Sequence, residues 1–328
     1  MISQIIGSGS ALPQQVISNR DLSIQLGVSE KELEKKTGIV TRHWVSHGET
    51  TASLAIDATR MALQSADIPP SAIDLIIVST SSPEMFFPSV ACFVQSALGC
   101  RSIPAFDINA SCSGFLYALS IGDQFIRGGR AENVLIIASE VKSIYLDRKN
   151  IQTVSLFGDG AGAMILSRTN RAGEGGRELQ SIKIFSGGPK KQLITLPAGG
   201  SALPLSLDLS PDLRFMKMDG TTLFRLAVKK LKEAISSLLD DNAISLEEID
   251  LFLFHQANGR ILDTVLKKNG ISAERHHTTI QKFGNTSSSS LPIAYDDAVK
   301  YGKIKQGATV GLCTFGGGFT WGYALVRG

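Results

Sequence analysis

The sequence predicts an α/β protein composed of two similar halves. Short apolar runs typical of buried strands alternate with longer amphipathic segments typical of helices along the 328 residues. Two pairs of segments echo one another: residues 73–78 resemble residues 249–254, and residues 133–137 resemble residues 308–312. Each member of the first pair precedes a helical segment that ends in a glycine. Because repeated strand–helix units build α/β sheets, this pattern favours two related halves over one doubly wound sheet.

The first half begins with an apolar strand and then alternates strands with capped helices. Strands are expected where apolar or alternating runs occur, at residues 2–12, 39–45, 73–78, 103–108, 134–138 and 164–166. Helices are expected between capping or small residues and a following glycine or proline, at residues 19–26, 29–38, 51–65, 90–98 and 114–126.

The second half repeats this rhythm. Strands are expected at residues 182–185, 249–254, 309–313 and 319–326, and helices at residues 221–239, 259–268 and 291–301. The segment 169–178 is rich in glycine and charged residues, and it separates the two series of alternating strands and helices. We therefore expect an N-terminal unit over residues 1–170 and a C-terminal unit over residues 171–328.

Composition restricts the class of protein. A hydrophobic content of 43% with 19% charged residues is ordinary for a soluble protein with a packed core, and a net charge of +3 is too small to suggest nucleic acid or membrane as a partner. Residues 1–7 resemble a strand and not a signal peptide, and no apolar run approaches the roughly 20 residues that span a bilayer. The four cysteines show neither a CxxC pair nor metal-ligand spacing. We expect a cytoplasmic, reduced protein without disulfides or a metal.

Cys112 is the first candidate for chemistry. It follows the apolar run 103–108 and precedes the helical segment that begins at Gly114, which places its sulfur on a tight strand-to-helix turn. The first-turn N–H groups and the helix dipole are expected to stabilise a thiolate at such a position. Cys112 is therefore a candidate nucleophile.

Three further segments supply possible partners at the ends of other strands. His255 follows an apolar strand, Asn285 lies in a glycine-flanked polar segment, and residues 316–318 are three glycines. Taken alone, His255 more often serves packing, Asn285 fits a turn or a helix N-cap, and the glycines fit a plain turn. Taken together, they place an imidazole, a carboxamide and a flexible backbone where ligands of open α/β sheets bind.

With these flanks the chain resembles the β-ketoacyl-acyl-carrier-protein synthase III family, which belongs to the thiolase superfamily of condensing enzymes. The matching motifs run in family order along essentially the whole chain: Cys112-Ser113-Gly114-Phe115, Phe157-Gly158-Asp159-Gly160-Ala161-Gly162, His255-Gln256-Ala257-Asn258, Gly284-Asn285-Thr286-Ser287 and Phe315-Gly316-Gly317-Gly318-Phe319-Thr320-Trp321-Gly322. A Cys-His-Asn set is typical of synthase III and its plant polyketide relatives. The resemblance implies a thiolase-like fold of five αβαβα layers produced by duplication.

The resemblance also implies a reaction. A starter thioester would acylate Cys112, and malonyl-acyl-carrier protein would lose CO₂ while His255 and Asn285 hydrogen-bond the enolate oxygen. The backbone N–H groups of Cys112 and Gly318 would form the oxyanion hole. The implied partners are acyl carrier protein, acyl-CoA and a second copy of the chain, with no permanently bound cofactor.

By the same resemblance, three apolar side chains are expected at the acyl pocket: Phe87, Leu156 and Phe315. Phe87 matches a phenylalanine that reaches across the family's dimer interface, and Phe315 matches one beside the catalytic cysteine that excludes water. Ordinary core packing is the alternative role for both aromatic residues.

The nucleotide clamp of the family is absent. Members that take acetyl-CoA carry a tryptophan and an arginine on the two faces of the adenine, and here those positions hold Glu32 and Ile151. Lys36 replaces another arginine near the nucleotide, whereas Arg148 and Lys149 are candidates to compensate. Losing both sides of the stack forfeits on the order of 1–3 kcal/mol, and a carboxylate at position 32 repels phosphate. We therefore expect weaker or different CoA binding, with carrier-protein or longer acyl-CoA starters as alternatives.

The resemblance further places the carrier protein's phosphopantetheine arm along a basic face near the pocket mouth. Its expected residues are Arg225, Asn258, Arg260, Lys267 and Lys268. A solvated helix face is the alternative role for such a charge run.

Three other functions are compatible with parts of the sequence. A specialised synthase of polyketide or cofactor biosynthesis is the nearest alternative. A cysteine hydrolase would use the same nucleophile, but the flanks of Cys112 do not resemble papain-type signatures. A non-catalytic carrier-protein-binding homologue would have no need of the Cys112, His255 and Asn285 set.

Overall fold

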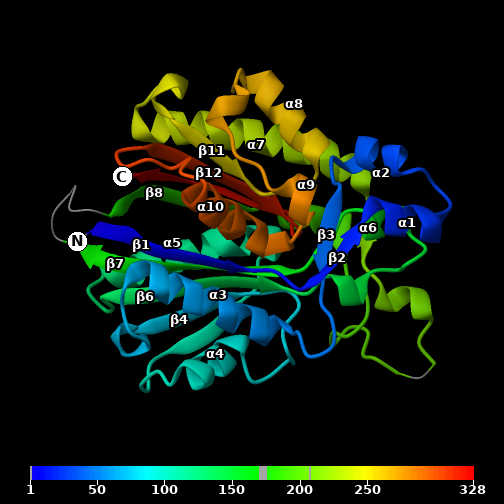
Figure 1. Ribbon diagram of the computed structural model, residues 1–328, viewed down its shortest axis with the longest axis horizontal. Helices are drawn as coiled ribbons and strands as arrows, with labels where there is room; N and C mark the ends of the chain where they lie inside the picture. Colours follow the sequence, from blue (N-terminus) through cyan, green and yellow to red (C-terminus); the bar gives the residue numbers. More distant parts are fainter. Residues whose placement is uncertain (1, 170–175, 207) are drawn as a thin grey trace.

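The computed structural model describes residues 2–169, 176–206 and 208–328. Over these residues, one mixed sheet of nine strands runs through the molecule in the order β11-β12-β13-β8-β1-β7-β6-β4-β5 (Figure 1). The strands are β1 (Ile2–Ala11), β4 (Leu75–Ser79), β5 (Ala105–Ile108), β6 (Asn133–Glu140), β7 (Gly160–Thr169), β8 (Arg177–Ser186), β11 (Leu251–Phe254), β12 (Thr309–Gly316) and β13 (Thr320–Arg327).

The sheet consists of two strand sets that meet at one narrow junction. Strands β1, β7, β6, β4 and β5 come from residues before position 170, and β8, β13, β12 and β11 come from residues after position 176. Between the two sets, β1 pairs with β8 only at Gln4↔Glu178 and Ile5↔Arg177. The expected domain boundary at residues 170 and 171 lies outside the described residues, so the division into two units stays a prediction.

Helices form three layers around the two strand sets (Figure 1). Helices α3 (Thr51–Ala66) and α4 (Val90–Leu98) cover the outer face of the first set, and α7 (Gly220–Asn242) and α8 (Gly259–Asn269) cover that of the second. Helices α5 (Gly114–Arg127) and α10 (Ser290–Lys300) lie between the sets, where α5 packs on β6 and on β8. The expected αβαβα fold is therefore confirmed.

Sequence features explain the close packing of the outer layer. Helix α3 begins at a capping box formed by Thr50 and Ser53. It lies so close to β1 that a Cβ on Gly9 would come within 2.4 Å of the Ala58 carbonyl oxygen. The glycines of β1 therefore allow the helix to approach, and the alanine-rich face of α3 packs against the strand.

Each half contains an equivalent pair of hydrogen bonds between an aspartate and the neighbouring parallel strand. Asp74 accepts the Asn133 N–H at 2.9 Å and donates its own N–H to the Asn133 carbonyl at 2.9 Å. In the second half, Asp250 accepts the Thr309 N–H at 2.8 Å and donates to the Thr309 carbonyl at 2.9 Å. Each aspartate immediately precedes a strand that pairs in parallel: β4 pairs with β6, and β11 pairs with β12. The first pair of similar segments, residues 73–78 and 249–254, thus corresponds to the same local structure, whereas the second pair is out of register by one residue because Asn133 is equivalent to Thr309 and not to Ala308.

Smaller elements lie around the ends of the strands. They are α1 (Asn19–Leu26), α2 (Glu30–Thr37), α6 (Ile151–Val154), α9 (Ile280–Phe283), β2 (Gln15–Ser18), β3 (Thr41–Trp44), β9 (Ile194–Thr195) and β10 (Lys217–Met218). Strands β2 and β3 pair with each other, as do β9 and β10. The sequence did not indicate β2, α6, α9, β9 or β10 because each is short.

Several expected boundaries were wrong. Strand β8 spans Arg177–Ser186 and not residues 182–185 alone. Strand β7 begins at Gly160 and not at residue 164, because its glycines and alanines pair with β1 as far as Ala11. A Cβ on Gly162 would lie 2.8 Å from the Pro292 side chain, so only small residues fit beneath α10. Helix α7 is capped by Asp219, whose side chain accepts the Thr222 N–H, and not by the two threonines.

Three global expectations are addressed by the described residues. None of their helices is long and apolar enough to cross a bilayer. All four cysteines are free thiols. No cluster of three or more histidine, cysteine or acidic side chains with metal-binding geometry occurs among these residues.

Candidate active site

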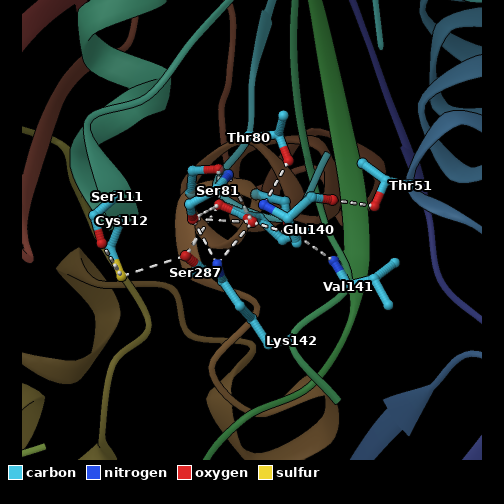
Figure 2. Close-up of polar contacts among 12 residues, drawn as sticks. Thr51, Thr80, Ser81, Ser111, Cys112, Glu140, Val141, Lys142 and Ser287 are labelled. Atoms are coloured by element: carbon cyan, nitrogen blue, oxygen red, sulfur yellow. Dashed lines mark hydrogen bonds and ion pairs between the residues drawn. The ribbon is translucent and has the colours of Figure 1, made fainter. Parts of the chain in front are cut away.

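Cys112 lies in a tight turn between β5 and α5, as the sequence predicted. The turn is the short 3₁₀ helix η2 (Ser111–Ser113), and Ser111 adopts a left-handed φ of 51° that the Asn109 side chain stabilises by accepting its N–H at 3.0 Å. The Cys112 side chain is buried, and its Sγ lies 3.4 Å from Ser287 Oγ and 3.9 Å from Ser111 Oγ (Figure 2). Thr314 of β12 donates to the Cys112 carbonyl at 3.2 Å, which fixes the turn against the second half.

The protonation state of Cys112 differs from the expectation of a stabilised thiolate. Burial raises the pKa of the thiol, and the opposing effects of the Ser287 hydrogen bond and the Lys142 charge do not outweigh it. The negative charge of Glu140 raises the pKa further. The resting group is therefore a thiol, and deprotonation accompanies the reaction.

His255 follows β11 directly. Its backbone N–H donates to the Cys313 carbonyl at 3.0 Å, and its Nδ1 lies 2.6 Å from Ser290 Oγ at the start of α10. The ring meets Phe315 edge-on, with 5.3 Å between centroids. Burial lowers the pKa of His255 to about 3, so the imidazole is neutral at physiological pH.

Asn285 precedes a second short turn, the 3₁₀ helix η8 (Ser287–Ser289). Its Oδ1 accepts the Ser287 N–H at 2.9 Å, and its backbone bonds to Leu156 and Gly158 at 2.9 and 3.0 Å. Because Oδ1 is occupied within the turn, the amide nitrogen is the group left to donate to a ligand. The turn-forming role and the ligand-facing role of Asn285 are therefore compatible.

The three predicted side chains meet in one inner cavity of about 90 Å³, defined by residues Cys112, Leu156, Phe157, Ile194, Met218, Gly220, Leu223, Phe224, His255, Ala257, Asn258, Ile261, Asn285, Phe315, Gly316 and Gly317. Most of these side chains are apolar. A thiol, a neutral imidazole and a carboxamide thus share a cavity that limits access of water, which strengthens any hydrogen bond formed inside it.

The inner cavity leads to a wider outer cavity of about 650 Å³. The two share Leu156, Met218, Gly220, Phe224 and Asn258, so together they form an entry channel that reaches Cys112 from the surface. The outer cavity is the larger and more polar of the two.

The structure places part of the predicted basic face at this channel. Arg225, Asn258 and Arg260 line the outer cavity. Lys267 and Lys268 are exposed in the last turn of α8, about two helical turns beyond Arg260, and do not line it.

The substituted clamp positions lie beside the same channel. Ile151 and Lys36 line the outer cavity, and Glu32 forms an ion pair with Lys36 at 2.6 Å. The Arg148 guanidinium lies 3.9 Å above the centre of the Trp44 ring, so this candidate substitute is already engaged within the protein.

The glycine segment contacts Cys112 through its backbone. Gly316 ends β12, and a Cβ there would lie 2.7 Å from the Cys112 nitrogen and 2.9 Å from the Ser113 nitrogen. Gly317 lines the inner cavity, and Gly318 has a left-handed φ of 127° that suits glycine. Gly318 is not among the described residues that line the cavity, so its part in an oxyanion hole stays a prediction.

The expected acyl-pocket residues divide between two places. Leu156 and Phe315 line the inner cavity. Phe87 lies in the loop before α4 with 84% of its surface exposed and does not contact that cavity within the described chain.

Sequence reasoning missed a buried ion pair behind Cys112. Glu140, at the end of β6, is fully buried and pairs with Lys142 at 3.0 Å (Figure 2). Burial raises the pKa of Glu140, but the Lys142 charge and several serine hydroxyls outweigh it and hold that pKa below its usual range. The signal available in the sequence was a Glu-x-Lys pair at the end of an apolar strand, where charged residues are rarely buried unless paired.

Comparisons with known proteins identify the family of the chain. The family 3-oxoacyl-[acyl-carrier-protein] synthase III matches residues 106–188, and its C-terminal family model matches residues 239–328. The chain is 42% identical to a β-ketoacyl-[acyl-carrier-protein] synthase III of Methylococcus capsulatus, covering 99% of this chain and 98% of that protein. A counterpart in Thiobacillus denitrificans is 40% identical, with 99% of each chain covered.

Solved structures give the same result. The synthase III of Aquifex aeolicus superposes with a TM-score of 0.91 at 36% identity, covering 99% of this chain and 100% of that one. A priming β-ketosynthase of the R1128 polyketide pathway has the same TM-score at 28% identity, covering 99% and 96%.

The fold and these similarities define a condensing acyltransferase of the thiolase type. Within that class, the chain belongs to the β-ketoacyl-[acyl-carrier-protein] synthase III family.

Proposed function

We propose that this enzyme condenses an acyl thioester starter with malonyl-acyl-carrier protein to give a β-ketoacyl-acyl-carrier protein, the step that initiates fatty-acid synthesis. The observation that carries the proposal is the meeting of Cys112, His255 and Asn285 in one buried cavity at the end of an entry channel. The family membership of the chain supports the same reaction.

In the first step, the Cys112 sulfur attacks the thioester carbonyl carbon, the carrier thiolate leaves, and it takes up the proton that Cys112 gives up. The carbonyl oxygen becomes negatively charged in the intermediate and needs donors. The backbone N–H groups of Cys112 and Gly318 are the proposed donors. The close approach of Gly316 to the Cys112 nitrogen, which an added Cβ would bring to 2.7 Å, supports this assignment because the glycine segment lies beside the nucleophile.

In the second step, the malonyl carboxylate leaves as CO₂ and its bonding electrons form an enolate. His255 Nε2–H and the Asn285 amide are the proposed donors to the enolate oxygen. Ser290 Oγ accepts the Gln256 N–H at 3.1 Å, and its own proton can bond to His255 Nδ1, which leaves the imidazole proton on Nε2. The enolate carbon then attacks the acyl-Cys112 carbonyl, and the Cys112 thiolate leaves and recovers a proton.

The starter is proposed to arrive on a carrier protein in preference to CoA. Glu32 and Ile151 provide neither face of an adenine clamp, and Arg148 is stacked on Trp44. Arg225 and Arg260 at the channel mouth suit the phosphate of a phosphopantetheine arm, which a carrier protein and CoA share. The missing clamp therefore weakens CoA more than a carrier-protein thioester.

The proposal extends to a homodimer in the cytoplasm. The exposed Phe87 and its neighbour Phe86 form an apolar surface suited to a second copy of the chain. Four free cysteines suit a reducing compartment.

The test uses the intact protein with matched starters. Acyl-CoA and acyl-carrier-protein forms of the same acyl group are incubated with the enzyme, the mass added to Cys112 is measured, and ¹⁴CO₂ release from labelled malonyl-carrier protein is followed. We expect acyl transfer from both donors, faster from the carrier protein, and CO₂ release that depends on the acylated enzyme.

The control variant is Cys112→Ala, which cannot carry the acyl group. Condensation at wild-type rate by this variant would contradict the proposed function. Equal transfer from both donors, with condensation intact, would contradict only the proposed preference for a carrier-bound starter.

A further inference from the structure

A second cavity is also lined by Cys112 and has no described lining residue in common with the outer cavity. Its volume is about 240 Å³, and it shares Cys112, Phe157, Ile194 and Gly317 with the inner cavity. An acyl group bound to Cys112 can therefore extend into this acyl-side cavity while the channel stays open. The acyl-side cavity shares Ser81, Asn109, Tyr145 and Leu196 with a further cavity of about 1,070 Å³, so the side chains in its wall, and not its volume, determine which acyl groups it favours.

The acyl-side cavity has an unusual wall for an acyl pocket. Its described lining residues are Ser81, Asn109, Ser111, Cys112, Lys142, Tyr145, Phe157, Ile194, Thr195, Leu196, Met216, Ser287 and Gly317. Among these residues, Lys142 is the one with a formal positive charge, and none carries a carboxylate. Ile194, Leu196 and Met216 provide an apolar side for methylene groups.

Glu140 is not among the described residues of this wall; it lies behind Lys142 and forms an ion pair with it. It is fully buried and accepts the Ser81 N–H at 3.1 Å together with several serine hydroxyls (Figure 2). The hydroxyl donors are Ser81 at 2.9 Å, Ser82 at 2.8 Å, Ser287 at 3.1 Å and Ser288 at 2.8 Å. These donors disperse the charge of Glu140 within the protein.

The Lys142 ammonium is held in place from the Glu140 side. Its Nζ lies 3.0 Å from Glu140 and donates to Ser81 Oγ at 2.5 Å. An ammonium group has three protons, so these two contacts leave capacity for a ligand in the cavity. The side chain is only 9% exposed, which means that a bound group would meet a largely desolvated charge.

We propose that the acyl-side cavity selects starters that end in a carboxylate, so that the enzyme is primed by an ω-carboxyacyl thioester. This inference rests on the proposed function, because it concerns the acyl group that Cys112 carries. The terminal carboxylate binds Lys142 Nζ, and the methylene groups lie along the apolar side of the cavity.

A starter that ends in a methyl group gains nothing from this wall. A methyl-ended starter displaces water from the ammonium and the adjacent hydroxyls but offers no carboxylate to bind them. Such sites discriminate strongly against ligands that lack the polar group. We therefore expect discrimination of at least tenfold.

The experiment compares acyl groups of equal carbon number delivered without a nucleotide. Wild-type enzyme is incubated with N-acetylcysteamine thioesters of succinate and butyrate, and of glutarate and valerate, and the rate of mass gain at Cys112 is measured. The expected result is at least tenfold faster transfer of the carboxylated member of each pair. Faster transfer of butyrate and valerate would overturn the inference while leaving the proposed function intact, whereas no transfer of any acyl group would count against the proposed function itself.

Variants then assign the preference to Lys142. Lys142→Met should lower the succinyl-to-butyryl rate ratio at least tenfold, and the double variant Glu140→Gln/Lys142→Met should do the same without leaving a lone buried carboxylate. Lys305→Met, at an exposed position, should keep the wild-type ratio. An unchanged ratio in a folded Lys142→Met or double variant would overturn the inference.

Discussion

Burial favours the neutral forms of both the Cys112 thiol and the His255 imidazole. The two half-reactions are therefore expected to depend differently on pH. The raised pKa of Cys112 makes the thiolate scarce at neutral pH, so its concentration rises with pH. The pKa of His255, lowered to about 3, keeps the imidazole neutral throughout the same range.

We expect the rate of acyl transfer to Cys112 to rise about tenfold per pH unit between pH 6 and pH 8, because the thiolate is the nucleophile. Decarboxylation by enzyme acylated beforehand should change little over this range. Rapid-quench intact mass and ¹⁴CO₂ release measure the two steps separately. An acyl-transfer rate that is flat over this range would show that Cys112 is already ionised at rest.

His255 and Asn285 should act after Cys112 is acylated. Replacing either with alanine removes one proposed donor to the enolate, which typically costs about 10²–10³ in rate. CO₂ release should fall by that factor while the mass gain at Cys112 stays within a few-fold of wild type. A variant that loses both steps together would instead indicate a structural role.

Gly316 is predicted to tolerate no side chain. The Cβ of Gly316→Ala would lie 2.7 Å from the Cys112 nitrogen, a backbone atom that cannot move independently of the turn. We expect a loss of about 1–3 kcal/mol in the free energy of unfolding and slower acyl transfer. The control is Gly188→Ala, where an added Cβ meets no atom within 4 Å. Urea unfolding and intact mass measure the two effects.

At the residue scale, the sequence predicted the groups that lie in linear motifs and missed those that depend on tertiary contact. Cys112, His255 and Asn285 each sit in a recognisable local pattern, and the structure brings them into one cavity. The Glu140–Lys142 pair was missed because its stabilising hydroxyls come from positions as distant as Ser81 and Ser287. No local pattern in the sequence reports such a pairing.

At the scale of elements, the two aspartate pairs show what the duplicated units share. Asp250→Ala would leave the buried Thr309 N–H without its acceptor. This change should lower the free energy of unfolding by about 1–3 kcal/mol. Asp74→Ala should cost a similar amount because Asp74 accepts two N–H groups, those of Glu132 and Asn133. Chemical denaturation of both variants, with the exposed Asp57→Ala as control, measures these costs. If neither variant has a lower free energy of unfolding than wild type, these bonds do not stabilise the strands.

Elements with a complete local signal were predicted well. Helix α4 was predicted at its observed bounds because Gly99 ends it. Strand β4 was predicted at residues 73–78 from its apolar run and is observed at Leu75–Ser79. The start of β7 was missed because glycine and alanine lack strand preference by themselves. These residues extend the strand only because β1 pairs with them and α10 leaves no room for larger side chains.

At the scale of the whole molecule, exposed apolar residues before α4 bear on assembly. Met85, Phe86 and Phe87 are 47%, 80% and 84% exposed, and Met85 and Phe86 border a cavity of about 1,070 Å³ next to the acyl-side cavity. Phe87→Asp should shift the proposed dimer toward monomer, as measured by sedimentation velocity. Ile24→Asp, which also alters an exposed apolar side chain, should leave the sedimentation coefficient unchanged. A wild-type protein that sediments as a monomer would contradict the proposed dimer.

The α/β class was predictable because strand and helix patterns alternate along the chain, whereas the five αβαβα layers were predicted from the family resemblance. The extent of the basic face was not predictable, because residues that are close in the sequence of α8 are not all close to the channel. Arg260 lies at the N-terminal end of that helix and Lys267 at the other, and only the former lines the outer cavity.

The position of Cys112 between two cavities has a kinetic consequence. Cys112 lines both the inner cavity at the end of the entry channel and the acyl-side cavity, and we propose that the starter occupies the latter. The first carrier can therefore depart before the second arrives, since both use the same channel and the acyl group no longer occupies it. Steady-state velocities at varied starter and malonyl concentrations should give parallel double-reciprocal lines, the signature of a ping-pong mechanism.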